Sequence, residues 1–155
     1  MTPEEIIARH PPIAPGLTLI WTALVDIAAR EDWGPSPRGH RYVVPITGGQ
    51  VFAGPGGEGL FGKVLPGGAD RQLVTSEGIK SLHALYEMQT DDGAILTIDN
   101  RVKIDETVGP APYRRSVIEV TAPEGRFAWM NHRIFVGTLE PAMPDRNAVI
   151  IRGWG

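Results

Sequence analysis

Short runs in which hydrophobic and polar side chains alternate make up most of this chain. A period of two places every second side chain on one face, which is typical of a half-buried β-strand. Glycine or proline turns end most of these runs, and the Asp92-Gly93 step between two of them is a strong hairpin signal. The predicted strands cover Leu17–Ala29, Tyr42–Ile46, Gly59–Leu65, Leu82–Thr90, Ala94–Asn100, Tyr113–Thr121, Phe127–Val136 and Ala148–Arg152. Many short strands with almost no helical period predict an all-β sandwich or barrel.

The first of these runs fits two patterns almost equally. A helical stripe would use Leu17, Ile20, Trp21, Leu24 and Ala28, whereas a strand face would use Leu17, Leu19, Trp21, Ala23, Val25 and Ile27. The Pro15-Gly16 turn before the run, and the strand-rich sequence after it, favour a strand.

One short helix is predicted at the N-terminus. Thr2 can serve as its N-cap, Pro3 occupies the first helical position, and Glu5 lies three residues after Thr2, so the segment has a capping box. The sequence His10-Pro11-Pro12 must end the helix, because proline disfavours the helical conformation of the residue before it.

Composition excludes several classes of function. The chain has 155 residues, which fit one domain, and 42% of them are hydrophobic, as in ordinary globular proteins. The net charge is −3 and the lysines and arginines are scattered along the sequence, so no basic stripe predicts a nucleic-acid partner. There are no cysteines, which excludes disulfides, a thiolate nucleophile and a cysteine-based zinc site.

Neither the N-terminus nor any apolar stretch predicts a membrane partner. Thr2-Pro3-Glu4-Glu5 is acidic and is not followed by the apolar core of a secretory signal. The longest apolar stretch, Leu17–Ala29, is too short to span a bilayer. We therefore expect a cytoplasmic location.

Five turn and strand motifs occur in an order that resembles one known family. They are Pro45-Ile46-Thr47-Gly48-Gly49, Val64-Leu65-Pro66-Gly67-Gly68-Ala69-Asp70, Leu85-Tyr86 with Thr90-Asp91-Asp92-Gly93-Ala94, Trp129-Met130-Asn131 and Phe135-Val136-Gly137. From about Leu17 to the C-terminus the chain looks like a member of domain-of-unknown-function family 3237, whose members are small antiparallel β-barrels without an agreed activity. The prediction is therefore a single antiparallel β-barrel of about eight to nine strands in residues 17–155, preceded by a short helix and arm in residues 1–16.

Three positions depart from the usual pattern of that family. Arg71 stands where an aromatic residue usually follows the Gly-Gly-Ala-Asp turn, His83 where an acidic residue is common, and His132 where an arginine is common. Substitutions of this kind retune a pocket, so an activity of a relative need not transfer to this chain.

Tyr86 and Asp70 are the first candidates for chemistry inside the barrel. Alternation places Tyr86 on the apolar face of its strand, where its phenol could donate a hydrogen bond to a ligand carbonyl or enolate. The alternative is a core tyrosine whose hydroxyl bonds a backbone carbonyl. Asp70 follows a glycine turn and either caps backbone amides or faces the barrel mouth as a general base. His40 and His83 compete with it, because an imidazole titrates near neutral pH.

The remaining candidates are arginines and a tryptophan–asparagine pair. Arg115 aligns with an arginine usual in the family and is a catalytic candidate if its guanidinium points into the barrel, where Asp70, Glu119 or an anionic ligand would have to pair with it. Arg41 alternates with His40 at the start of a strand. If residues 127–136 form a strand, Trp129 and Asn131 share one face and could provide a stacking wall and an amide for ligand recognition. For Trp129, packing in the core is the alternative.

No metal ion or cofactor is predicted. The four histidines, His10, His40, His83 and His132, form no pair at metal-ligand spacing. The favoured hypothesis is a cofactor-independent enzyme that performs acid/base chemistry (isomerisation, cyclisation or dehydration) on an aromatic or polyketide-like substrate. The alternatives are a non-catalytic binding protein for an apolar small molecule, and a structural role in which the barrel exterior forms a homo-oligomer.

Overall fold

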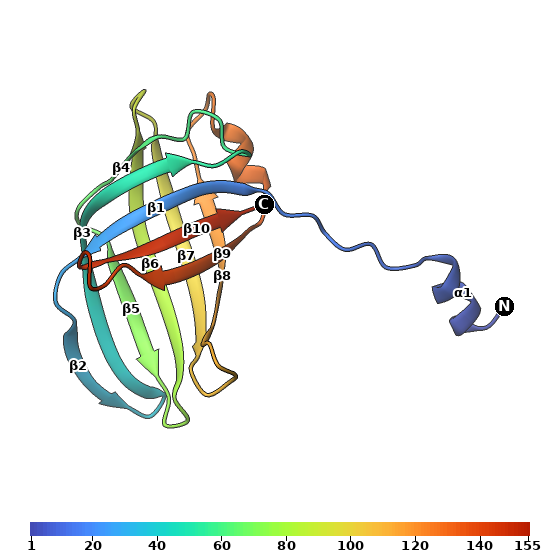
Figure 1. Ribbon diagram of the computed structural model, residues 1–155, viewed down its shortest axis with the longest axis horizontal. Helices are drawn as coiled ribbons and strands as arrows, with labels where there is room; N and C mark the ends of the chain where they lie inside the picture. The colour runs from blue at the N-terminus through green and yellow to red at the C-terminus, as the bar shows by residue number, and fades with distance from the viewer.

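The computed structural model describes residues 1–155 and contains ten strands (Figure 1). The strands are β1 (Leu19–Ile27), β2 (Glu31–Ser36), β3 (Gly39–Ala53), β4 (Gly62–Val64), β5 (Ala69–Val74), β6 (Ile79–Thr90), β7 (Ile95–Asp105), β8 (Tyr113–Thr121), β9 (Phe135–Pro141) and β10 (Ala148–Trp154). The helix α1 (Pro3–Arg9) precedes them, and a 3-10 helix, η1 (Ala128–His132), lies between β8 and β9.

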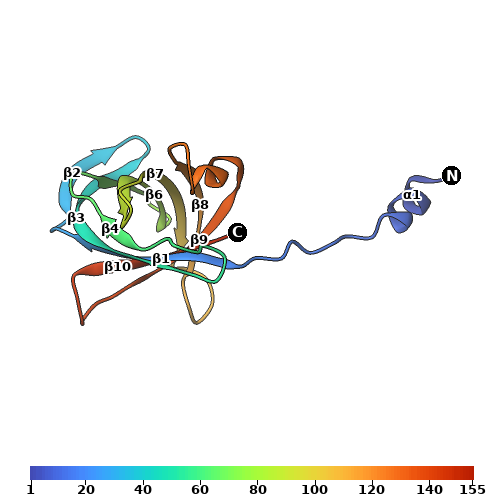
Figure 2. The same cartoon turned by 90° about the horizontal axis from the view of Figure 1, so that it is seen from above.

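Helix α1 stands away from the rest of the molecule at the end of an extended arm (Figures 1 and 2). The predicted capping box is present, since the Thr2 side chain accepts from the Glu5 N–H and the Glu5 carboxylate accepts from the Thr2 N–H. The helix ends at Arg9, and none of its residues is buried. No helix in the structure is long and apolar enough to cross a membrane.

The strands close into an antiparallel barrel. Its eight members follow the order β1, β10, β9, β8, β7, β6, β5 and β3, and β3 pairs with β1 to complete the ring. Strands β4 and β5 both lie between β3 and β6, at opposite ends of them, and β2 pairs with the first part of β3 outside the ring. The predicted single antiparallel barrel with a short N-terminal helix is therefore confirmed, with two strands beyond the closed set of eight.

The pairing of β1 with β3 depends on a glycine. Gly49 lies opposite Val25 of β1, and a Cβ at Gly49 would lie 2.0 Å from the Leu24 carbonyl oxygen. Its φ of +141° is also a conformation that residues with side chains rarely adopt. Only glycine thus allows the two backbones to approach closely enough at this point to close the barrel.

The ambiguous run at the start of the domain is a strand. As β1 it pairs with β10 on one side and with β3 on the other, so both of its edges are hydrogen-bonded. These non-local partners decide between the two patterns that its sequence fits, because a helix would leave two strands of the ring without a neighbour.

The prediction of a strand over residues 127–136 is wrong for most of its length. Residues 128–132 form the 3-10 helix η1, and strand structure begins only at Phe135. The helix buries Met130, and Trp129 contacts the ring of Phe135 edge-on, with centroids 6.1 Å apart. The same apolar residues that suggested a strand therefore fill one end of the barrel.

Large side chains pack the interior at the η1 end. Trp21, Leu60, Met130 and Phe135 are completely shielded from solvent. The ring of Trp21 meets that of Phe135 edge-on at a centroid distance of 5.3 Å. Gly153 makes room for the Trp21 ring, since a Cβ there would lie 2.4 Å from it. This end of the barrel is a packed core.

Replacing Gly49 by alanine should destabilise the protein by about 2–3 kcal/mol, because the new Cβ would clash with the backbone of β1. Urea unfolding measures this free energy. Gly67→Ala is the matched control: Gly67 also has a positive φ, +103°, but a Cβ there would have no atom within 4 Å, so alanine should cost only about 1 kcal/mol. Equal losses in the two variants would show that close strand approach is not the constraint.

Candidate functional site

A cavity of about 110 Å³ occupies the end of the barrel away from η1. Its lining residues come from seven of the eight strands of the ring, namely β1, β3, β5, β6, β7, β9 and β10. Eleven of its fourteen lining residues are hydrophobic. A cavity of this kind suits a small and largely apolar molecule.

Three polar side chains place unpartnered atoms in this apolar lining. Asp70 Oδ1, Tyr86 Oη and Asn100 Oδ1 are buried and have no hydrogen-bond partner in the protein. Buried polar atoms are nearly always paired, because an unpaired one costs about 1–3 kcal/mol. Three such atoms in one cavity therefore indicate a place where a bound molecule supplies the missing partners.

The strand register brings these three side chains together. Asp70 on β5 lies opposite Ala84 on β6, and Asn100 on β7 lies opposite the same alanine from the other side. Tyr86 follows Ala84 by two residues on β6 and so faces the same way. Because Ala84 is small, the space between the carboxyl, the amide and the phenol is left open.

The carboxyl of Asp70 is tuned by opposing influences. Burial raises the pKa of Asp70, whereas a hydrogen bond from Gln72 Nε2 to Asp70 Oδ2, 2.9 Å long, and the charge of His83 both oppose this rise. Gln72 is the next inward residue of β5 and holds one carboxyl oxygen, so that the other is directed at the cavity. A carboxyl with a raised pKa in an apolar cavity is a stronger base than an ordinary aspartate and is suited to taking and returning a proton.

The phenol of Tyr86 stays protonated at neutral pH. Burial raises the pKa of Tyr86 well above its ordinary value, and the nearby carboxyl of Asp70 raises it further. Gly68 permits this packing, because a Cβ at that position would lie 2.4 Å from the Tyr86 Cβ. The hydroxyl does not bond a backbone carbonyl, so its proton remains available to a ligand.

Asn100 is the member of this set that the sequence reasoning missed. The predicted strand ended at this residue, whereas β7 continues to Asp105. Its inward positions are Leu96, Ile98, Asn100, Val102 and Ile104, so one amide interrupts an otherwise aliphatic series. The sequence contained this signal, a polar residue at a buried strand position. It can be recognised only if the strand is predicted to continue beyond Asn100.

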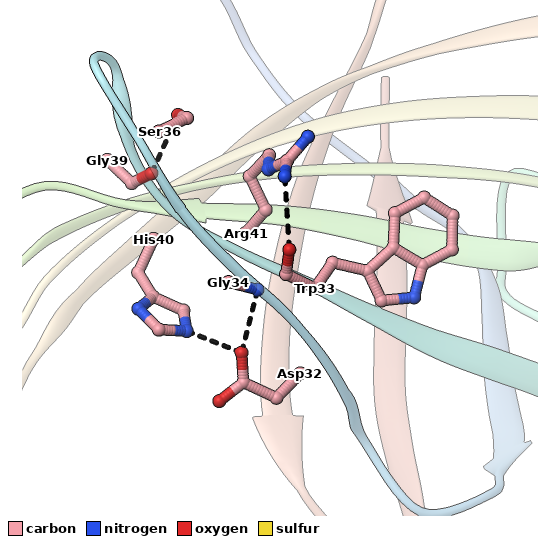
Figure 3. A network of polar contacts seen from close by, with 7 residues as sticks. All are labelled: Asp32, Trp33, Gly34, Ser36, Gly39, His40 and Arg41. Atoms are coloured by element: carbon pink, nitrogen blue, oxygen red, sulfur yellow. Dashed lines mark hydrogen bonds and ion pairs between the residues drawn. The ribbon is translucent and has the colours of Figure 1, made fainter.

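The structure places His40 and Arg41 outside the cavity, on the hairpin formed by β2 and β3 (Figure 3). His40 Nε2 contacts Asp32 Oδ1 at 2.5 Å, and this hydrogen bond is the main cause that lowers the pKa of Asp32. The His40 ring stacks on Tyr42 with centroids 4.6 Å apart. Arg41 donates to the Trp33 carbonyl at 3.0 Å, so both side chains hold the hairpin together.

His83 and Arg115 lie on the outer face of the barrel. His83 Nε2 is 2.9 Å from Asp99 Oδ1, on the next strand. Arg115 is exposed, donates to the Arg114 carbonyl at 2.9 Å, and has its guanidinium 5.5 Å from the centre of the Tyr113 ring. The expected inward guanidinium is therefore not part of the cavity, because the register gives Arg115 an outward position opposite Lys103.

Trp129 and Asn131 do not share a strand face, because both belong to η1. Trp129 packs against the core at that end of the barrel. The Asn131 amide accepts from the Ala122 N–H at 2.9 Å and donates to the Ala122 and Ala128 carbonyls, both at 3.0 Å. These hydrogen bonds connect η1 to the end of β8, at the end of the barrel opposite the cavity. Nowhere in the structure do three His, Asp or Glu side chains gather in a metal-binding arrangement.

Comparison with known proteins gives matches over most of the chain. Residues 15–154 match the family described as "Protein of unknown function (DUF3237)". A UPF0311 protein from Rhodopseudomonas palustris is 33% identical over 132 residues, which cover 77% of this chain and 84% of that protein. A UPF0311 protein from Clostridium acetobutylicum is 36% identical over 111 residues, which cover 63% of this chain and 68% of that one.

Solved structures share the fold. A conserved protein of unknown function from Rhodopseudomonas palustris superposes with a TM-score of 0.81 at 27% identity, and the match covers 92% of this chain and 98% of that one. An enzyme from Penicillium herquei superposes with a TM-score of 0.72 at 19% identity, and the match covers 94% of this chain and 98% of that one. An identity of 19% shows only that the enzyme from Penicillium herquei shares the fold of this chain.

Replacing Asp70 by asparagine should change how stability depends on pH. The folded-state pKa of Asp70 is raised above its ordinary value of 3.8, so the native protein loses stability as the pH rises from that value through the folded-state pKa. Asparagine is neutral at every pH in this range, so the variant does not lose this stability. The Asp70→Asn protein should therefore be more stable at neutral pH, and the gain should vanish as the pH falls toward 3.8. Urea unfolding across this range measures it, and a gain that grows at low pH would contradict the assignment.

Proposed function

This chain belongs to the DUF3237 family of proteins of unknown function, and from the cavity of its barrel we propose that it is a cofactor-independent enzyme that moves a proton on a small, largely apolar substrate. The observation that carries the proposal is the set of three unpartnered polar atoms, from Asp70, Tyr86 and Asn100, in one apolar cavity. A core that served packing alone would be more stable with apolar side chains at these positions.

Asp70 acts as the base and then as the acid. Its carboxylate removes a proton from the carbon next to a substrate carbonyl, and the electron pair of the broken C–H bond moves into the enolate. If the substrate has a C=C bond next to the deprotonated carbon, the pair spreads into a dienolate and the same carboxyl returns the proton to its far carbon, which isomerises the substrate. If the neighbouring carbon instead carries a hydroxyl, the enolate expels it, and the protonated Asp70 supplies the proton with which it leaves as water, so that the result is dehydration. The raised pKa of Asp70 makes its carboxylate a stronger base for the first transfer.

Tyr86 stabilises the negative charge that forms on the substrate oxygen. Its hydroxyl is buried, protonated and without a partner, so it can donate to the enolate in an apolar site. Asn100 Oδ1 accepts a hydrogen bond from a second polar group of the substrate, such as a hydroxyl. These three contacts would orient a ring against the aliphatic walls of the cavity.

The size of the cavity supports a single ring, and its lining supports an aromatic or polyketide-like unit with one or two oxygens. A dry cavity of about 150 Å³ in another protein accommodates benzene, so 110 Å³ is of the right order for a six-membered ring. The barrel from Penicillium herquei, described as an enzyme, supports the view that this fold can carry catalysis.

The alternative is a binding protein without turnover, and the hydrophobic majority of the lining favours it. The two functions differ in whether a bound ring exchanges protons with the protein. A purely structural barrel receives less support, because such a barrel would be packed at both ends.

Hydrogen–deuterium exchange distinguishes the two functions. With cyclohexanone and cyclohex-2-enone in D₂O as probes, the enzyme should accelerate exchange next to the carbonyl, and NMR measures the rate. The Asp70→Asn variant should lose about a hundredfold of this rate. Glu87→Gln is the matched control, since it removes a half-buried carboxylate that follows Tyr86 on β6 and does not line the cavity, so it should leave the rate unchanged. Binding of either ketone without accelerated exchange would favour the binding protein.

Tyr86→Phe should separate catalysis from stability. The variant should lose about a hundredfold of the exchange rate, because the enolate loses its donor. Its free energy of unfolding should stay within about 0.5 kcal/mol of the unchanged protein or exceed it, because the hydroxyl has no partner to lose. A large loss of stability would instead identify the hydroxyl as a structural group.

A further inference from the structure

A second hollow, of about 500 Å³, lies on the outside of the barrel and is lined by cationic side chains. It extends over the start of β3 and over β5, β6 and β7. We call it the outer groove and define it by six residues: Arg38, Arg41, Arg71, His83, Arg101 and Lys103. None of these residues lines the cavity inside the barrel.

The sheet register gathers these side chains from distant parts of the sequence. Arg71 on β5 lies opposite His83 on β6, which lies opposite Arg101 on β7, so three basic residues form one row across three strands. In the next row Arg41 on β3 and Lys103 on β7 face outward on either side of a leucine and a serine. Charges that are scattered along the chain thus meet on one face.

The groove concentrates positive charge on a negative protein. Five of the fifteen lysines and arginines line it, although the chain carries a net charge of −3. No Asp or Glu is among its lining residues. The neighbouring Asp99 is 2.9 Å from His83 and 3.4 Å from Arg101, and the Arg101 side chain remains 69% exposed. The cations that line the groove repel one another, and a bound anion would relieve this repulsion.

Neutral partners orient several of these cations without cancelling their charge. Arg41 donates to the Trp33 carbonyl at 3.0 Å, and Lys103 Nζ donates to Ser81 Oγ at 2.6 Å. The Arg71 guanidinium lies 5.6 Å from the centre of the half-exposed Trp33 ring. Cations that are held in place and left uncompensated form a prearranged site for an anion.

We propose that the outer groove binds a small oligoanion that carries two or more linked phosphate groups. The guanidinium forks of Arg41, Arg71 and Arg101 match the geometry of phosphate oxygens, and Lys103 adds a point charge on the far side. Several cations spread over three strands suit a chain of phosphates better than a single anion. This site is separate from the proposed reaction in the barrel, and its test does not depend on that reaction.

Calorimetric titration at physiological ionic strength tests the proposal. One arm uses inorganic tripolyphosphate and another uses ATP, to distinguish a free phosphate chain from one attached to a nucleoside. We expect saturable binding of tripolyphosphate. Arg101→Glu should weaken this binding about tenfold, and the milder substitution Arg71→Gln should weaken it about fivefold. Both residues are exposed, so the variants should melt at nearly the temperature of the unchanged protein.

Arg133→Glu is the matched control, because it changes the net charge by the same amount as Arg101→Glu at an exposed position outside the groove. It should leave the affinity within about twofold. Equal weakening by the two charge reversals, or no binding of tripolyphosphate, would overturn the proposal. Tighter binding of a DNA duplex than of either small oligoanion would also overturn it, in favour of a nucleic-acid surface.

Discussion

The structure depends on the pairing of β1 with β3, which closes the sheet. Without it both strands would expose an unpaired edge, and the row of free N–H and C=O groups would invite aggregation. The pairing requires a close approach of two backbones, and Gly49 allows it because any Cβ there would meet the Leu24 carbonyl. Once the ring is closed, every inward side chain must share one confined interior.

That interior is filled unequally, and the difference creates the site. At one end the 3-10 helix η1 and the rings of Trp21 and Phe135 form a packed core. At the other end aliphatic side chains surround an open cavity that contains the carboxyl of Asp70 and the phenol of Tyr86. Leaving these polar groups without partners reduces the stability of the folded protein. Natural proteins retain such groups where they serve a ligand or a reaction.

The same strands carry opposite chemistry on their two faces. Asp70 and Arg71 are neighbours in sequence, yet alternation turns the first into the cavity and the second into the outer groove. The wall between the two sites is one sheet thick, and the charge of His83 on the outer face reaches the carboxyl of Asp70 on the inner one. One barrel wall thereby supports an apolar cavity and a cationic surface at the same time.

The sequence by itself determined the all-β class, the N-terminal capping box and the inward direction of Tyr86, because these follow from period-two alternation, turn residues and local hydrogen bonds. Only the tertiary structure decided that Leu19–Ile27 is a strand, that Trp129 belongs to a 3-10 helix, and that Arg115 points outward. It also decided which residues meet. Asp70, Tyr86 and Asn100 converge, and five scattered cations share one groove, because both sets depend on the register between strands. Alternation decides which face a side chain takes, but the register also depends on the length and geometry of each turn, and the alternating pattern alone therefore does not show which residues lie opposite one another.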